Sequence, residues 1–145
     1  MVYNEKGFTL LESLLVLSIF LLVVSFSLIL LKPHYLILEK HFFFSQLKAD
    51  LLYAQQYALS TQKQVNVTFS NQNHFYYIRK YNGELLVKRD YSEDISVTGG
   101  TQPTSFKYTS SGNINSFGSL YIYIGKEGYL FTFLIGGGRF YVMKI

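Results

Sequence analysis

The uncharged apolar run at residues 14–31 constrains this chain more than any other part of the sequence. Its only polar side chains are three serine hydroxyls, and counted from Phe8 the run is 24 residues long, interrupted by the single charge of Glu12. A helix of that length spans roughly 27 to 36 Å, which matches the hydrocarbon thickness of a bilayer. Serine hydroxyls can donate to carbonyls of the preceding turn, so they do not oppose insertion. The run therefore predicts one membrane-spanning helix.

A cleaved secretory signal is the alternative interpretation of an N-terminal apolar run. Such signals have a positive first segment and an apolar core of about 7 to 15 residues. Here residues 2–6 carry one acid and one base, and the apolar run is longer than that core. Ser25 and Ser27 have the small-residue spacing of a cleavage site, but four further apolar residues follow them. We therefore favour the membrane-spanning interpretation.

Glu12 places a carboxylate near the start of the apolar segment. A charged side chain costs about 2.5 to 3.5 kcal/mol at the centre of a membrane helix and less near its end. Glu12 could lie at the level of the lipid headgroups, or it could have a function that requires the charge. Its position alone leaves both explanations open.

The stretch Gly7-Phe8-Thr9-Leu10-Leu11-Glu12-Ser13 resembles the class III signal of type IV pilins and pseudopilins. In that family a prepilin peptidase cuts after the glycine on the cytoplasmic face and methylates the new amine. The resemblance implies that residues 1–7 are a leader, that Gly7 and Phe8 flank the cut, and that Phe8 becomes N-methylated. It also implies that Glu12 is an assembly residue, whose carboxylate pairs with the Phe8 amine of a neighbouring subunit. Such a pair is far more stable in a dry helical bundle than a lone charge.

The residues after the apolar run predict an amphipathic continuation of the same helix. Pro33 is expected to bend the helix, since proline removes a backbone donor and clashes with the preceding turn. Apolar residues then recur at steps of 3, 4 or 7, as one helix face requires: Leu36, Phe43, Leu47, Leu51, Ala54 and Ala58. We therefore expect a transmembrane segment at residues 8–31 and an amphipathic segment at residues 32–62.

Residues 63–145 predict an antiparallel β-sheet body, because the hydrophobic period changes to two and turn residues recur. The expected strands are 65–69, 74–81, 84–89, 95–97, 104–109, 119–124, 129–135 and 139–145. Asn82-Gly83 predicts a two-residue hairpin turn, in which Arg79 would oppose Leu86, and residues 125–128 predict a second turn. The fold class is therefore α+β, with a long N-terminal helix packed on an antiparallel β-meander.

The C-terminal part extends the family resemblance. The stretches FKYTSSGNI and LIGGGRFYVMKI resemble the C-terminal sheet of minor pseudopilins of the GspH and FimT type, in which Gly-x-Gly often precedes an arginine. Gly136, Gly138 and Arg139 fit that pattern. In overall layout the chain is most similar to the competence pseudopilins of Gram-positive bacteria.

This resemblance implies a minor subunit of a short, type IV pilus-like fibre that is needed for binding and uptake of exogenous DNA during transformation. The chain would cross the cell membrane once, with its C-terminal body outside, and reach the cell surface in the fibre. Its implied partners are other pseudopilins, the prepilin peptidase and, indirectly, the assembly platform protein and its ATPase. A minor pilin of a secretion or adhesive pilus is the alternative.

The residues that catalytic and metal sites require are not arranged for such chemistry. The chain has no cysteine, which excludes disulfides and thiol chemistry. His34, His41 and His74 have no metal-like spacing, and the glycines at 136–138 precede an expected strand, unlike a phosphate-binding loop. We expect no metal, no cofactor and no enzymatic activity, and a membrane-anchored surface enzyme has no supporting set of residues.

The expected hairpin combines aromatic and basic side chains. Tyr77, Arg79 and Lys88 share one face, an arrangement typical of surfaces that bind nucleic acid by stacking and phosphate contact. The net charge of +4 is compatible with such a polyanion. Ordinary sheet packing, with long cations lying over tyrosines, explains the same pattern. The sequence leaves direct contact with DNA open.

Substitution of Gly7 tests the leader assignment. Gly7→Ala is expected to leave residues 1–7 attached, because the peptidase would no longer recognise the bond that it cuts. The check is the intact mass of the chain in cells with and without the prepilin peptidase. A mature chain that begins elsewhere than at N-methylated Phe8 would contradict the assignment.

Overall fold

The structure, a computed structural model, describes residues 9–134 and 138–145, apart from the side chains of residues 28–34. The chain divides into two compact units, Met1–Glu39 and Lys40–Ile145, and each is considered by itself. One helix, α1 (Leu10–Thr61), contributes to both units.

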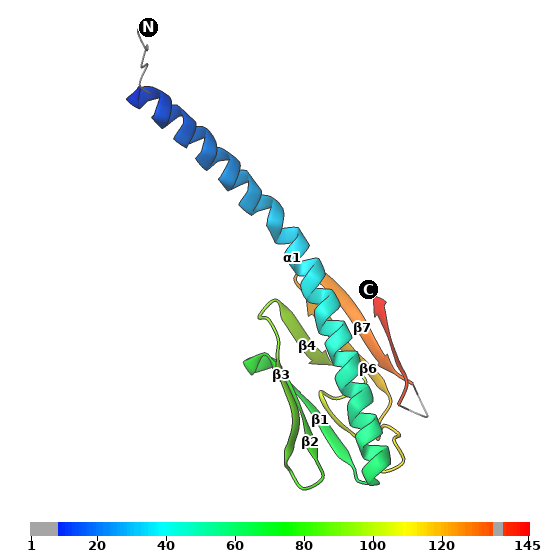
Figure 1. The fold of residues 1–145 in the computed structure, drawn as a ribbon. Coiled ribbons are helices and arrows are strands. Elements are labelled where there is room, and N and C mark those ends of the chain that lie inside the picture. The colour runs from blue at the N-terminus through cyan, green and yellow to red at the C-terminus, as the bar shows by residue number, and fades with distance from the viewer. Residues whose placement is uncertain (1–8, 135–137) are drawn as a thin grey trace. The chain divides into compact units, whose positions relative to one another are not determined.

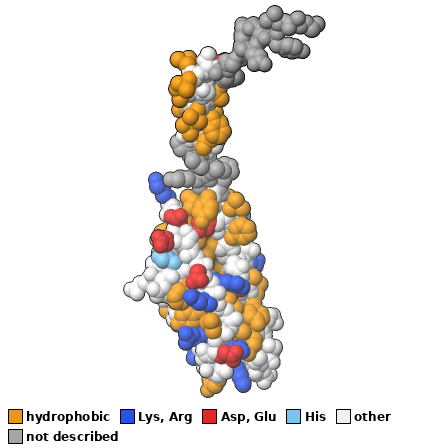
Figure 2. Space-filling model, turned by 60° about the vertical axis from the view of Figure 1, so that its left-hand side comes forward, with side chains coloured by type: hydrophobic (Ala, Val, Ile, Leu, Met, Phe, Trp, Pro, Cys, Tyr) orange, Lys and Arg blue, Asp and Glu red, His pale blue; other side chains and the backbone are white. Residues whose placement is uncertain are grey.

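The first unit is the apolar part of α1. Its segment Leu10–Ser27 has a mean hydropathy of 2.4 and no buried residue, so it has the length and composition to cross a membrane. The described side chains of this segment are mainly hydrophobic in Figure 2. Ser18 Oγ donates to the Leu15 carbonyl at 2.8 Å and Ser25 Oγ to the Leu21 carbonyl at 2.7 Å, as expected. The helix continues through residue 33, and the bend expected at Pro33 stays a prediction.

The second unit begins with the amphipathic part of α1, which lies across strands of both sheets (Figure 1). Five members of the predicted stripe are buried: Phe43, Leu47, Leu51, Ala54 and Ala58. The opposite side of the helix exposes Phe42, Leu52 and Tyr53. For these five residues the prediction that the stripe faces the core is confirmed, whereas Leu36 is only half-buried.

Eight strands follow α1 in the described part of the chain, one for each strand that the sequence predicts. They are β1 (Val65–Ser70), β2 (Phe75–Lys80), β3 (Leu85–Asp90), β4 (Ile95–Gly99), β5 (Ser105–Tyr108), β6 (Gly118–Ile124), β7 (Glu127–Phe133) and β8 (Phe140–Lys144). A short 3-10 helix, η1 (Asn71–Asn73), joins β1 to β2. The predicted α+β class is confirmed.

The strands are not arranged as one continuous meander. They form two antiparallel sheets, sheet A with the order β3-β2-β1-β5 and sheet B with the order β4-β6-β7-β8. The chain crosses to sheet B for β4, returns to sheet A for β5, and crosses again for β6. Hydrophobic alternation indicates which side of a strand is buried and not which strand lies beside it. The expectation of a single meander is corrected for that reason.

The β2–β3 hairpin has a three-residue turn, so the expected two-residue turn is wrong. Gly83 N–H donates to the Lys80 carbonyl at 3.0 Å, and Lys80 N–H donates to the Glu84 carbonyl at 2.9 Å. Gly83 has φ +83°, the left-handed conformation that completes a turn of this kind without steric cost.

The longer turn changes the pairing only beside the turn, and Tyr77 still lies opposite Lys88 as the sequence predicted. Arg79 lies opposite Leu85, and Leu86 is left in a bulge, whereas the sequence predicted an Arg79–Leu86 pair. Leu86 packs against the core as a result. In the β6–β7 hairpin the turn is shorter than expected, because Ile124 pairs directly with Glu127.

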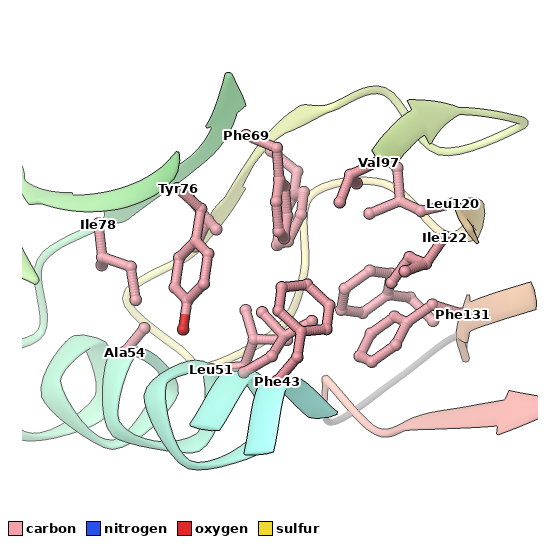
Figure 3. Close-up of a cluster of buried hydrophobic side chains, with 14 of the residues drawn as sticks. Phe43, Leu51, Ala54, Phe69, Tyr76, Ile78, Val97, Leu120, Ile122 and Phe131 are labelled. Atoms are coloured by element: carbon pink, nitrogen blue, oxygen red, sulfur yellow. The ribbon is translucent and has the colours of Figure 1, made fainter. Parts of the chain in front are cut away.

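The core is one continuous cluster between α1 and the inner faces of both sheets. Figure 3 shows Phe43, Leu51 and Ala54 of α1 with side chains from sheets A and B around them. The rings of Phe106 and Phe133 lie 4.8 Å apart, centroid to centroid, and join the two sheets directly. The two sheets therefore share a single hydrophobic interior.

Asp50 is a buried carboxylate that ties α1 to sheet A. Its Oδ2 accepts from Tyr76 Oη at 2.8 Å and from Arg89 Nε at 3.1 Å, and its Oδ1 accepts from Gln46 Nε2 at 3.2 Å. Burial, and then the hydrogen bond to Asp50, raise the pKa of Tyr76 well above its usual value. A buried charge is tolerated only when it is paired and hydrogen-bonded, which these donors achieve.

A second polar cluster ties α1 to sheet B. Lys40 Nζ lies 3.2 Å from Glu127 Oε2, and Lys144 and Tyr129 also donate to the Glu127 carboxylate. The hydrogen bonds from Lys144, Tyr129 and Lys40 lower the pKa of Glu127 to about 2. The carboxylate therefore stays ionised at neutral pH, and its charge is matched locally.

Replacement of Asp50 tests how much the buried cluster contributes to stability. We expect Asp50→Ala to reduce the free energy of unfolding by about 3 kcal/mol, because it leaves the Tyr76 hydroxyl unpaired and Arg89 without its counter-charge. Gln46→Ala is the control and should cost about 1 kcal/mol or less, since only a neutral donor is lost. Urea unfolding of the full chain in detergent micelles gives both values, and equal losses would contradict a special role for Asp50.

Candidate functional site

Gly7 and Phe8, the two residues that flank the expected cut, lie outside the described residues. Glu12, the expected assembly residue, lies in the first turn of α1. Its carboxylate is exposed, and its contacts are all local. The expected pairing with an amine of a neighbouring subunit stays a prediction.

Glu12 and Thr9 form a capping box at the start of α1. Glu12 N–H donates to Thr9 Oγ1 at 3.3 Å, and Thr9 N–H donates back to Glu12 Oε2 at 3.5 Å. In such a box two of the unpaired backbone donors at a helix N-terminus are satisfied reciprocally. The bond to the carboxylate is at the long limit for a hydrogen bond. It therefore leaves the carboxylate free to accept a stronger donor.

Thr9 was not among the predicted partners of Glu12, although the sequence carries a signal for it. Thr-x-x-Glu ahead of an apolar run is the pattern of a capping box. The box turns the Glu12 carboxylate back toward the helix start, which is the end of the chain where cleavage after Gly7 would create the amine of Phe8. The local geometry is thus compatible with both the capping and the assembly role.

The aromatic and basic residues of the β2–β3 hairpin are brought together as expected. Tyr77 lies opposite Lys88, and Arg79 follows Tyr77 on the same side of β2. The Arg79 guanidinium carbon lies 4.8 Å from the Tyr77 ring centroid, and Lys88 Nζ lies 4.5 Å from the Phe75 ring centroid. Cations thus already lie over both rings, as the sheet-packing interpretation expects.

An open groove of about 440 Å³ lies beside this hairpin. Its lining includes Lys63 just after α1, Tyr81 of the hairpin turn, and Lys107 of β5. The sequence did not indicate this groove, because it depends on the pairing of β5 with β1 across some forty residues of chain. Within residues 9–134 and 138–145, no group of three or more His, Asp or Glu side chains is placed to hold a metal ion.

The comparisons with known proteins identify the family. Residues 3–28 match the prokaryotic N-terminal methylation motif. The chain is 32% identical over 136 residues to the competence protein ComGD of Bacillus subtilis (strain 168). The matched residues cover 94% of this chain and 92% of that protein. The chain belongs to the ComGD family of competence proteins. The resemblance to competence pseudopilins is thereby confirmed.

The fold has a relative among solved structures. The structure is similar to that of the minor pseudopilin EpsH from the Type 2 Secretion System of Vibrio cholerae, with a TM-score of 0.52. The similarity covers 69% of this chain and 92% of that one, at 13% sequence identity. At that identity the likeness concerns the fold, and it confirms the pilin-like arrangement of helix and sheets.

Proposed function

We propose that this chain is a minor pseudopilin of the competence machinery, built into a short type IV pilus-like fibre that is needed for uptake of exogenous DNA. The observation that carries this proposal is the identity to a competence protein over nearly the whole length of both chains. The methylation motif and the pilin-like fold support it independently. The likeness to a secretion pseudopilin lies at the level of fold and does not favour the secretion alternative.

Before assembly, the chain crosses the cell membrane once through residues 8–31, with its body outside. The prepilin peptidase removes residues 1–7 and methylates the amine of Phe8. The apolar composition of Leu10–Ser27 supports this topology. In the fibre the body reaches the cell surface, carried by the amphipathic segment at residues 32–62 and built from residues 63–145.

The protein acts by packing and not by catalysis. Its partners are other pseudopilins of the fibre and, during export, the assembly platform and its ATPase. The exposed side of α1, with Phe42, Leu52 and Tyr53, supports helix-to-helix packing against neighbours. Large exposed apolar side chains of this kind mark interaction surfaces.

Glu12 directs assembly by pairing with the methylated amine of Phe8 on the next subunit. The exposed carboxylate has only long bonds to Thr9 in the single chain, so an ammonium group would bind it more strongly. Among apolar helices such a pair removes two isolated charges at once. The pairing therefore favours the entry of each subunit into the fibre in one register.

Deletion of the gene tests the competence function. We expect transformation by added DNA to fall to background and to return when the intact chain is supplied in trans. Protein content of the culture medium should stay unchanged, which separates competence from secretion. Normal transformation in the deletion strain would overturn the proposal.

Two substitutions at Glu12 separate the charge from the cap. Glu12→Ala removes both, whereas Glu12→Gln keeps an oxygen that can cap Thr9 and removes the charge. Because assembly requires the charge, we expect both variants to insert in the membrane and to fall at least tenfold in the sheared fibre fraction, measured by immunoblot. Thr9→Ala, which keeps the carboxylate, is the matched control and should enter the fibre. Rescue by glutamine would show that the cap is what matters and would contradict the pairing.

A further inference from the structure

We propose that the outer face of sheet A, together with the groove beside Tyr81, is a binding surface for DNA strands with unpaired bases. This inference rests on the proposed competence function, which it deepens by assigning the contact with DNA to particular side chains. The surface combines the two features that such strands need, namely unpaired cations and an uncovered aromatic ring.

The groove offers many donors and no carboxylate. Its lining includes two lysines, Lys63 and Lys107, which carry ammonium groups. Two glutamines, Thr109 and Ser110 add amide and hydroxyl groups. In the described part of the chain neither lysine forms an ion pair. A concave surface with cations and hydroxyls but no acid favours an anionic ligand with several oxygens.

Sheet register extends the positive charge of the groove across sheet A. Lys107 lies opposite Asn66 of β1, and Asn66 lies opposite Arg79 of β2, so the three form one outward row. Asn66 alternates with the buried Val65 and Val67, which places this row on the outer face.

The next outward row carries Lys88, which lies opposite Tyr77. Among the residues that the structure describes, Asp90 and Glu84 border this surface, and both are paired. Asp90 lies 3.4 Å from Lys88 Nζ, and Glu84 lies 2.7 Å from Lys80 Nζ. Lys63, Arg79 and Lys107 therefore keep a net positive charge along a track from the groove to the hairpin.

Tyr81, rather than Tyr77, is placed to stack on a base. The Tyr77 ring is covered by Arg79, whereas Tyr81 is 64% exposed. Tyr81 and Lys63 also line a second, smaller hollow of about 150 Å³, so the ring stands between two depressions. A base can therefore stack on the Tyr81 ring while the flanking phosphates contact Lys63 and Lys107.

The first test measures DNA affinity directly. The full chain in detergent micelles is titrated against a fluorescein-labelled 20-nucleotide single strand, with anisotropy read at several salt concentrations. Tyr81→Ala should weaken binding about 5- to 100-fold, and Tyr81→Phe should bind as the parent does. The double variant Lys63→Gln with Lys107→Gln should weaken binding. It should also reduce the slope of log K against log salt concentration by about 1.4, the value for two phosphate contacts on a single strand.

The controls show whether any exposed lysine attracts DNA or only the lysines of the groove. Lys126→Gln removes an exposed lysine of the β6–β7 turn and should leave affinity unchanged. Polyglycerol phosphate, which has phosphodiesters but no bases, should compete weakly and equally against the parent and Tyr81→Ala. Equal effects of Lys126→Gln and the double variant would overturn the proposal. So would full DNA affinity in Tyr81→Ala, because the surface would then bind phosphodiesters without reading bases.

A cellular test separates this inference from the proposed function. The Tyr81→Ala and double-lysine variants should enter the fibre normally and reduce transformation at least tenfold. Normal transformation by both variants, in a strain where deletion abolishes it, would overturn the DNA surface and leave the competence function standing. Normal transformation after deletion would overturn the competence function itself.

Discussion

Burial of one stripe of α1 against two sheets is the contact on which the rest of the body depends. Neither sheet could be stable alone, because each has a hydrophobic inner face that must be covered. Phe43, Leu47 and Leu51 supply large apolar surfaces, each worth about 1.5 to 3 kcal/mol when fully buried. Ala54 and Ala58 follow on the same stripe and are fully buried as well. Asp50 on this part of α1 then orients sheet A through Tyr76 and Arg89.

The sequence predicted α1 and each of the eight strands, but it predicted neither η1 nor how the strands pair. Periodicity is a local property, so it located α1 and the eight strands to within a few residues. Sheet order depends on contacts between distant segments, such as Val65 with Tyr108, which no local pattern encodes. The same limit explains the hairpin. Asn82-Gly83 predicts a turn but not its length. The turn has three residues and ends at Gly83 with a positive φ, so Arg79 pairs with Leu85 and not with Leu86.

A local sequence motif can be recognised without a structure, but a site built from distant segments cannot, and the two candidate sites differ in this respect. Glu12 belongs to a motif that is contiguous in sequence, so an assembly role for it could be proposed without any structure. The capping partner Thr9 is encoded just as locally, by the Thr-x-x-Glu pattern ahead of the apolar run. Lys63 and Lys107 instead come together through the β1–β5 pairing. A groove built from segments so far apart has no signature in a single sequence.

Charge pairing explains why the positive surface lies on sheet A. Lys40 and Lys144 are both directed to Glu127, so the cations between α1 and sheet B are matched there. Arg89 is directed inward to Asp50, which removes it from the outer face of β3. On the outward rows of sheet A, Lys88 is paired with Asp90, whereas Lys107 and Arg79, and Lys63 at the groove, form no ion pair in the described part of the chain. A net charge of +4 is modest for the whole chain, but Lys63, Arg79 and Lys107 lie near an uncovered ring, and it is this local arrangement that an anionic strand would meet.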